Sequence, residues 1–217
     1  MKKLILLALC AIIAGPAIMT ASAKEPSTKE LVEETRKKMK TDKLAKKEVK
    51  RLTNERWLAF EGTDPLEIQQ SKQIAYSNTT DENGEALFYM GNGSFTTNDK
   101  GAALKFAKKR AYLDIAEQLE TKIGAAGNME LSTSGAGDTN VSTNKNGESA
   151  KSLVAQKLSG VRPVVQMYRK SGSQYEVNVV VFYSRERAKE AAAEAYGKAY
   201  QGNPELLERA RKALEEL

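Results

Sequence analysis

The stretch from Gly101 to Gly124 carries the strongest periodic pattern in this sequence, and it limits what the rest of the chain can fold into. Small and apolar residues recur every four positions at Ala103, Ala107, Ala111, Ile115, Leu119 and Ile123. Beside this row, Leu104, Tyr112 and Ala116 widen the apolar side of the segment. This is the pattern of an amphipathic helix with one buried face. The other segments are therefore expected to cover that face.

The amino terminus has the pattern of a secretory signal peptide. A basic start at Lys2 and Lys3 precedes an apolar run, and Ala21-Ser22-Ala23 has the small-residue form of a cleavage site. The run is interrupted by Gly15-Pro16 and is shorter than the roughly 20 apolar residues that span a membrane. We expect residues 1–23 to be removed and the mature protein to be exported, to the periplasm or in association with the outer membrane.

Cys10, the only cysteine, raises the alternative of a lipid anchor. A lipoprotein signal would place a small residue directly before the acylated cysteine, but Leu9 stands there. We therefore expect Cys10 to belong to the signal peptide. The mature chain would then contain neither cysteine nor histidine, which excludes disulfides, thiolate nucleophiles, the common zinc sites and Ser-His-Asp triads. No cofactor is expected.

Residues 24–60 are expected to form a charged helical leader, which begins at a capping-box pattern from Ser27 to Glu30. The leader contains twelve lysines and arginines and seven acidic residues, a net charge of about +5. Its second half carries apolar residues that could dock on the body: Leu44, Val49, Leu52, Trp57, Leu58 and Phe60. The only tryptophan, Trp57, is interpreted as such a docking residue rather than as a sugar-binding surface.

Residues 61–200 are expected to form an α+β domain, with a small antiparallel sheet packed against the central helix. Asp64 would cap a helix that begins at Pro65 and runs to about Ser77. A strand at Ala86 to Gly91 would continue or bulge through Gly93 to Thr96.

Two further strands, Val161 to Arg169 and Tyr175 to Tyr183, are expected to pair as a hairpin. Before them, residues 125–148 would be either an irregular excursion or a weak strand near Met129, followed by a helix from Ser149 to Leu158. The chain would end in an alanine-rich helix capped by Ser184 and a C-terminal helix within 201–217, opened by Asn203 and Pro204.

Three segments between Leu66 and about Ala195 can be compared with a known family: YMGNGSF, RAYLDIAEQL and AQKLSGVRPVVQMYRKSGSQYEVNVVVFY. With the order of the parts around them, they resemble the LPP-twenty lipoprotein family and the related amino-terminal domain of the flagellar assembly T protein. The resemblance implies an α+β domain of secreted or outer-membrane-associated bacterial proteins, which are often lipoproteins. It implies no catalytic residues. The sequence departs from this family in its basic leader and in lacking a convincing lipidation cysteine.

Three patterns that might mark a site have simpler structural interpretations. Gly91-Asn92-Gly93 lacks the rest of a phosphate-binding loop and is interpreted as a β-bulge. Residues 81–85 lack the ligand spacing of a calcium loop and are interpreted as a turn. Asp114 and Glu117 could form an acid-base pair, but an exposed helix face with local ion pairing is preferred, and Arg110 could instead reach a carbonyl of the sheet.

The best-supported functional feature is the density of lysine in the leader. The pattern favours a solvated helix face, and the alternative is contact with an anionic surface. The candidate cations for that contact are Lys37, Lys38, Lys40, Lys43, Lys46, Lys47, Lys50 and Arg51. We expect a non-enzymatic envelope protein that binds another protein or helps to assemble a surface structure. The alternative is a module that binds anionic cell-wall polymers or makes a peripheral membrane contact. Nucleic acid is not expected because of the export signal. The oligomeric state is left open.

Overall fold

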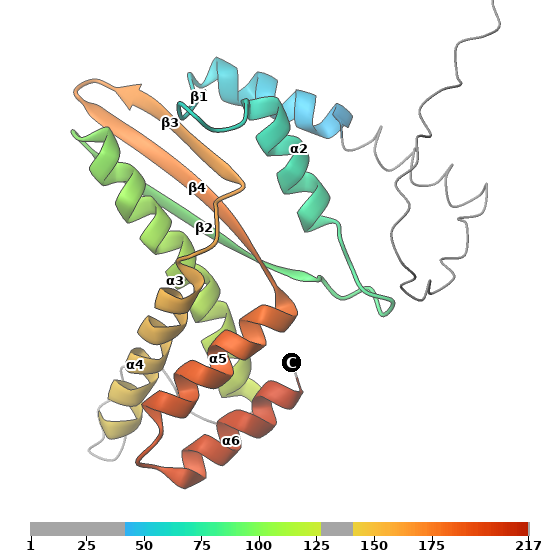
Figure 1. The fold of residues 1–217 in the computed structure, drawn as a ribbon. Helices are drawn as coiled ribbons and strands as arrows, with labels where there is room; N and C mark the ends of the chain where they lie inside the picture. The colour runs from blue at the N-terminus through green and yellow to red at the C-terminus, as the bar shows by residue number, and fades with distance from the viewer. Residues whose placement is uncertain (1–41, 127–140, 217) are drawn as a thin grey trace, which may run out of the picture. The chain divides into compact units, whose positions relative to one another are not determined.

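The computed structural model describes residues 42–126 and 141–216, all of which lie in one compact unit. The expected α+β fold is confirmed, with helices packed on a four-stranded antiparallel sheet in the order β1-β3-β4-β2 (Figure 1). A helical segment at residues 42–54 precedes the elements β1 Leu58–Ala59, α2 Leu66–Ser77, β2 Phe88–Thr97, α3 Lys100–Ala126, α4 Val141–Leu158, β3 Val165–Ser171, β4 Gln174–Ser184, α5 Arg185–Ala199 and α6 Pro204–Glu215.

The helix α3 is the predicted central helix, and its four-residue row of small and apolar side chains is fully buried. This row belongs to the main core together with Val177, Val179 and Val181 of β4 and with buried residues of α4, α5 and α6. Figure 1 shows the first half of α3 alongside the sheet and its second half among the three later helices. The helix therefore joins the sheet to the helical part of the fold.

The contact between α3 and β2 is unusually close because β2 has glycine where the two elements touch. A Cβ at Gly91 would lie 2.1 Å from the carbonyl oxygen of Ala111, and one at Gly93 would lie 2.0 Å from that of Ala107. The pairing of β2 with β4 is continuous from Phe88 to Thr97, so the predicted bulge is wrong. The glycines instead provide the space in which a helix backbone approaches a strand backbone.

Side chains of α3 also cover the outer edge of β2, where backbone groups have no neighbouring strand. Arg110 donates to the carbonyl of Ser94 at 2.8 Å, which confirms the expected contact with a sheet carbonyl. The Asp114 carboxylate accepts from the amide of Asn92 at 2.7 Å. Gln118 donates to the carbonyl of Met90 at 2.8 Å. Polar groups that would otherwise be open to a second strand are thus satisfied within the chain.

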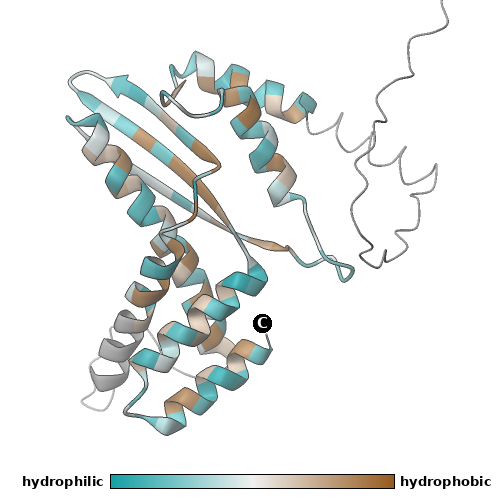
Figure 2. Cartoon of the chain, in the orientation of Figure 1, coloured by the Kyte–Doolittle hydropathy of each residue, from teal (hydrophilic) through white to brown (hydrophobic). Residues whose placement is uncertain are grey.

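The opposite face of the sheet is covered by α2 and by the helical segment 42–54. Val180 and Phe182 are buried there together with Val165, so β4 is buried on both faces. The ring of Tyr76 in α2 stacks on that of Phe182, with centroids 5.2 Å apart. Figure 2 shows hydrophobic residues along the middle of β4, whereas the turn between β3 and β4 is hydrophilic.

Several boundaries differ from the sequence-based expectations. Pro65 is the N-cap of α2 and not its first residue, and Asp64 makes no capping hydrogen bond because its carboxylate pairs with Lys72. The helix α4 begins at Val141, earlier than the expected Ser149, and the proposed strand near Met129 lies outside the described residues. β3 begins at Val165, two residues after Pro163.

The caps of the last two helices are confirmed. The Ser184 side chain accepts from the amide of Arg187 at the start of α5, and the Asn203 side chain accepts from that of Leu206 at the start of α6, where Pro204 is the first residue. In the helical segment 42–54, Ala45, Val49 and Leu52 are buried, and Val49 and Leu52 pack with Trp57 and Leu66.

Replacing Gly93 with alanine is expected to lower the free energy of unfolding by about 2–3 kcal/mol, because the new methyl group would meet backbone atoms that cannot move aside. Urea denaturation measures the change. The matched control is Gly197→Ala in α5, where an added Cβ meets nothing within 4 Å. That variant should gain about 0.5–1 kcal/mol from higher helix propensity. Equal stability of the two variants would contradict the close-contact interpretation of Gly93.

Candidate functional site

The lysines of the leader that the structure describes form a row on the outer side of the helical segment 42–54. Lys43, Lys46, Lys47 and Lys50 are exposed, and within the described residues none of them forms an ion pair. Arg51 is also exposed, but it pairs with both Glu48 and Glu55. Lys37, Lys38 and Lys40 lie outside the described residues. We call Lys43, Lys46, Lys47 and Lys50 the lysine row.

The lysine row is held in place by the opposite side of the same helix. Val49 and Leu52 pack there with Trp57 and Leu66, and Trp57 is only 7% exposed, which confirms its expected packing role. The Trp57 indole nitrogen donates to Glu55 at 3.2 Å, and the Arg169 guanidinium lies 4.7 Å from its ring centroid. A fixed apolar face leaves the lysines directed toward solvent.

A groove of about 700 Å³ runs between this helix and α2. Lys47 and Lys50 line it together with Leu44 and Ile74, and Leu44 is 46% exposed. Leu58 is 55% exposed. The expectation that Leu44 and Leu58 dock on the body is therefore wrong. The groove therefore combines cationic and apolar side chains, a combination that the lysine pattern alone did not reveal.

The conceivable acid-base pair on α3 is not assembled. The carboxylate of Asp114 is directed to the edge of β2, where it accepts a backbone hydrogen bond. The carboxylate of Glu117 lies 3.8 Å from the ammonium group of Lys151 on α4. The two groups thus serve different contacts, and the arrangement does not present both carboxylates to one substrate.

Residues 81–85, which were compared with a calcium loop, form a turn that the side chain of Asp81 stabilises. One oxygen of the Asp81 carboxylate accepts from the amides of Asn83 and Glu85, both at 2.9 Å, and the other pairs with Arg185. Gly84 has a φ of 83°, which favours glycine. In the described ranges no group of three or more acidic residues is placed to hold a metal ion.

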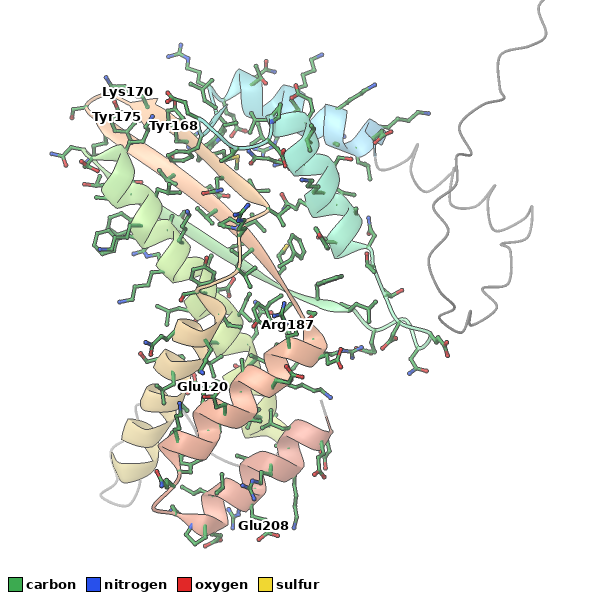
Figure 3. All side chains as sticks on the ribbon, in the orientation of Figure 1. Glu120, Tyr168, Lys170, Tyr175, Arg187 and Glu208 are labelled. Atoms are coloured by element: carbon green, nitrogen blue, oxygen red, sulfur yellow. The ribbon has the colours of Figure 1, made fainter. Side chains whose placement is uncertain are left out.

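An aromatic cluster lies near the turn between β3 and β4, where Figure 3 shows Tyr168, Lys170 and Tyr175 close together. The Lys100 ammonium lies 4.6 Å from the ring centroid of Tyr168, and Lys170 lies 5.7 Å from that of Tyr175. Phe60 completes the cluster at 5.0 Å from Tyr168. Since each of the three rings already has a lysine of the same chain over it, these contacts account for the cluster as internal packing.

Glu120 is the buried carboxylate of the main core, only 4% exposed, and Figure 3 shows it among the helices. Lys151 pairs with it at 3.5 Å. Burial and the negative charge of Glu120 raise the pKa of Tyr200 to about 12 and also raise that of Tyr196. The hydroxyls of both tyrosines have no hydrogen-bond partner in the described structure. This cluster links α3, α4 and α5 as a packing feature.

No family model matches the chain, and no curated protein is significantly similar to it. The resemblance to the LPP-twenty lipoprotein family stays a prediction based on the residues that carry it. Within residues 42–126 and 141–216, no helix has both the length and the hydropathy needed to cross a membrane.

The buried tyrosines predict a loss of stability in alkali. An unfolded tyrosine ionises near pH 10, whereas Tyr200 retains its proton up to about pH 12. As the pH rises, the unfolded state therefore loses the proton of this tyrosine before the folded state does. The free energy of unfolding falls between about pH 10 and pH 12, by at most about 1.4 kcal/mol per pH unit for one tyrosine.

Urea denaturation at several alkaline pH values measures this loss. Tyr200→Phe should show a shallower decline than the parent protein because it has no phenolic proton to lose. At neutral pH it should stay within about 1 kcal/mol of the parent, since the hydroxyl it removes is unpaired. An unchanged pH dependence in this variant would show that Tyr200 is not responsible.

Proposed function

We propose that this protein is a non-enzymatic binding module of the bacterial cell envelope that holds an acidic protein partner through the lysine row. The observation that supports the proposal most directly is the row of four exposed lysines without ion pairs in the described structure, on a helix whose other side is buried. Export and the role in assembling an envelope structure rest on the sequence pattern of residues 1–23 and on the family resemblance.

The rigid attachment of the helix gives the lysines a binding role that a mobile tail would not have. Ala45, Val49 and Leu52 fix the helix axis, so the charges keep one spacing without a partner. A preformed cationic surface accelerates association with an acidic partner and costs less ordering entropy on binding. Such binding is expected to weaken with salt, since the Debye length is only about 8 Å at physiological ionic strength.

The groove favours a protein partner over a purely anionic polymer. Leu44 and Ile74 line it beside Lys47 and Lys50, which fits a segment with both apolar and acidic side chains. A cell-wall polymer or a lipid headgroup would need the charges but not the apolar side chains. The proposal includes no reaction and no cofactor.

The proposal is tested by neutralising the lysine row in the full chain with Lys43→Gln, Lys47→Gln and Lys50→Gln together. Crosslinking pull-down from envelope fractions should recover the partner roughly tenfold less well than with the parent protein. The control is Lys105→Gln with Lys109→Gln, which removes exposed lysines of α3. Substitution is preferable to deleting the leader, since a deletion would also remove the buried Val49.

A second variant separates the two kinds of partner. Leu44→Ser should lower recovery of a protein partner but leave pelleting with purified cell wall or anionic vesicles unchanged. If the lysine variant loses pelleting and Leu44→Ser has no effect in either assay, the ligand is an anionic polymer or membrane surface. A pull-down that recovers no reproducible partner would count against the protein-binding proposal.

A further inference from the structure

A second cavity, of about 620 Å³, lies on the other flank of α2 from the lysine row. α2 contributes Gln69, Lys72 and Tyr76 to this cavity, whereas it contributes Gln70, Gln73 and Ile74 to the groove. The two sites therefore share no residue. The remaining walls come from residues 62–64 before α2, from Lys108 of α3, and from residues 162–164 and Gln166 at the start of β3.

The cavity exists because β1 is short. β1 pairs only with Met167 and Tyr168, so the first part of β3 has no neighbouring strand on that side. α2 and α3 pack on opposite faces of the sheet, and side chains of both reach the cavity at this uncovered edge. The backbone amide of Gln166 at the same edge donates to the side chain of Gln69 at 2.8 Å.

Three cations from three separate elements line the cavity: Lys72, Lys108 and Arg162. The only carboxylate in its lining is that of Asp64, which pairs with Lys72 at 2.6 Å. Lys108 and Arg162 have no ion pair within the described residues. The lining thus carries two positive charges that no carboxylate in it balances. Like charges that converge without counter-charges repel one another, and a bound anion would remove that repulsion.

The floor of the cavity is preorganised. Gln69 is 1% exposed, and its amide nitrogen donates to the hydroxyl of Thr63 at 3.1 Å and to the carbonyl of Asp64 at 2.5 Å. Together with the bond from Gln166, these contacts hold the Gln69 side chain in one orientation. Tyr76 is held at the rim by its ring contacts with Phe88 and Phe182. The walls are therefore in place before any ligand enters.

We infer that this cavity binds a phosphoryl group. A phosphate monoester near neutral pH carries about two negative charges, which would balance the two excess cations, whereas a monocarboxylate would leave one unbalanced. The guanidinium of Arg162 can bind two oxygens of such a group at once, and a lysine serves as a point charge beside it. The volume is in the range of roughly 300–1,000 Å³ that is usual for small-ligand sites.

The phosphoryl group could belong to a soluble phosphate ester or to a phospholipid headgroup, so the experiment uses both as probes. Calorimetric titration of the full chain with sn-glycerol 3-phosphate measures binding of the soluble form. Flotation with phosphatidic acid vesicles, whose headgroup is a phosphate monoester, compared with phosphatidylcholine vesicles, measures binding of the lipid form. Binding in the first assay identifies a soluble ligand, and binding only to the anionic vesicles identifies a headgroup.

Lys108→Gln combined with Arg162→Gln should weaken the observed binding at least tenfold, while thermal unfolding shows that the variant remains folded. The control Lys105→Gln with Lys109→Gln removes the same charge from exposed positions of α3 and should bind within about twofold of the parent. Failure of both probes to bind the parent, equal binding by the double variant, or equally tight binding of acetate would overturn the inference.

The triple variant Lys43→Gln, Lys47→Gln and Lys50→Gln tests this inference separately from the proposed function. The three residues lie outside the cavity, so the variant should bind sn-glycerol 3-phosphate as the parent protein does. If that variant weakened binding of this probe as strongly as the Lys108 and Arg162 variant, the binding would reflect general basicity and the cavity would not be the site.

Discussion

The direct contact between the backbones of α3 and β2 determines the arrangement of the whole described structure. Gly91 lies against the carbonyl of Ala111 and Gly93 against that of Ala107, with no room for a side chain between them. Once this contact is made, the buried row of α3 lies on the valines of β4, and the far half of the helix becomes the surface on which α4, α5 and α6 assemble. The tight contact thus links the sheet layer to the helical layer.

The proposed binding features are grouped around α2, and of the residues that line the groove and the cavity only Lys108 belongs to α3. The face of the sheet that meets α3 is built from small and apolar residues, whereas the lysine row, the groove and the cationic cavity all border α2. Such a division allows the α2 side to differ in charge and shape without disturbing the main core. It also explains why the acidic residues of α3, which first suggested chemistry, serve structural contacts with β2 and α4.

The sequence predicted those elements whose signal is local. The periodicity of α3 and the caps Ser184 and Asn203 depend on residues within a few positions of one another. The meaning of Gly91 and Gly93 was missed because glycine permits both a bulge and a close contact, and only the distant helix decides between them. The two-residue β1 and the early start of α4 lack a periodic signal of their own.

The same limit applies to the candidate sites. The lysine row is visible in the sequence because its members are neighbours on one helix. The cationic cavity is not, because Lys72, Lys108 and Arg162 are far apart in the chain and meet only when α2, α3 and the segment before β3 are placed around the open edge of the sheet. A cluster of charged residues from separate elements produces no recognisable pattern in the sequence, because the fold alone brings them together.

The polar cover of β2 has a consequence for how this fold can vary in length. Successive contacts advance by four residues on α3, through Arg110, Asp114 and Gln118, and by two residues in the reverse direction on β2. Four helical residues rise about 6.0 Å and two strand residues about 6.6 Å, so the two repeats stay in step for these three contacts before drifting apart. A one-residue insertion in either element would misalign the hydrogen bonds beyond it. Insertions and deletions should therefore accumulate in the loops that connect the elements.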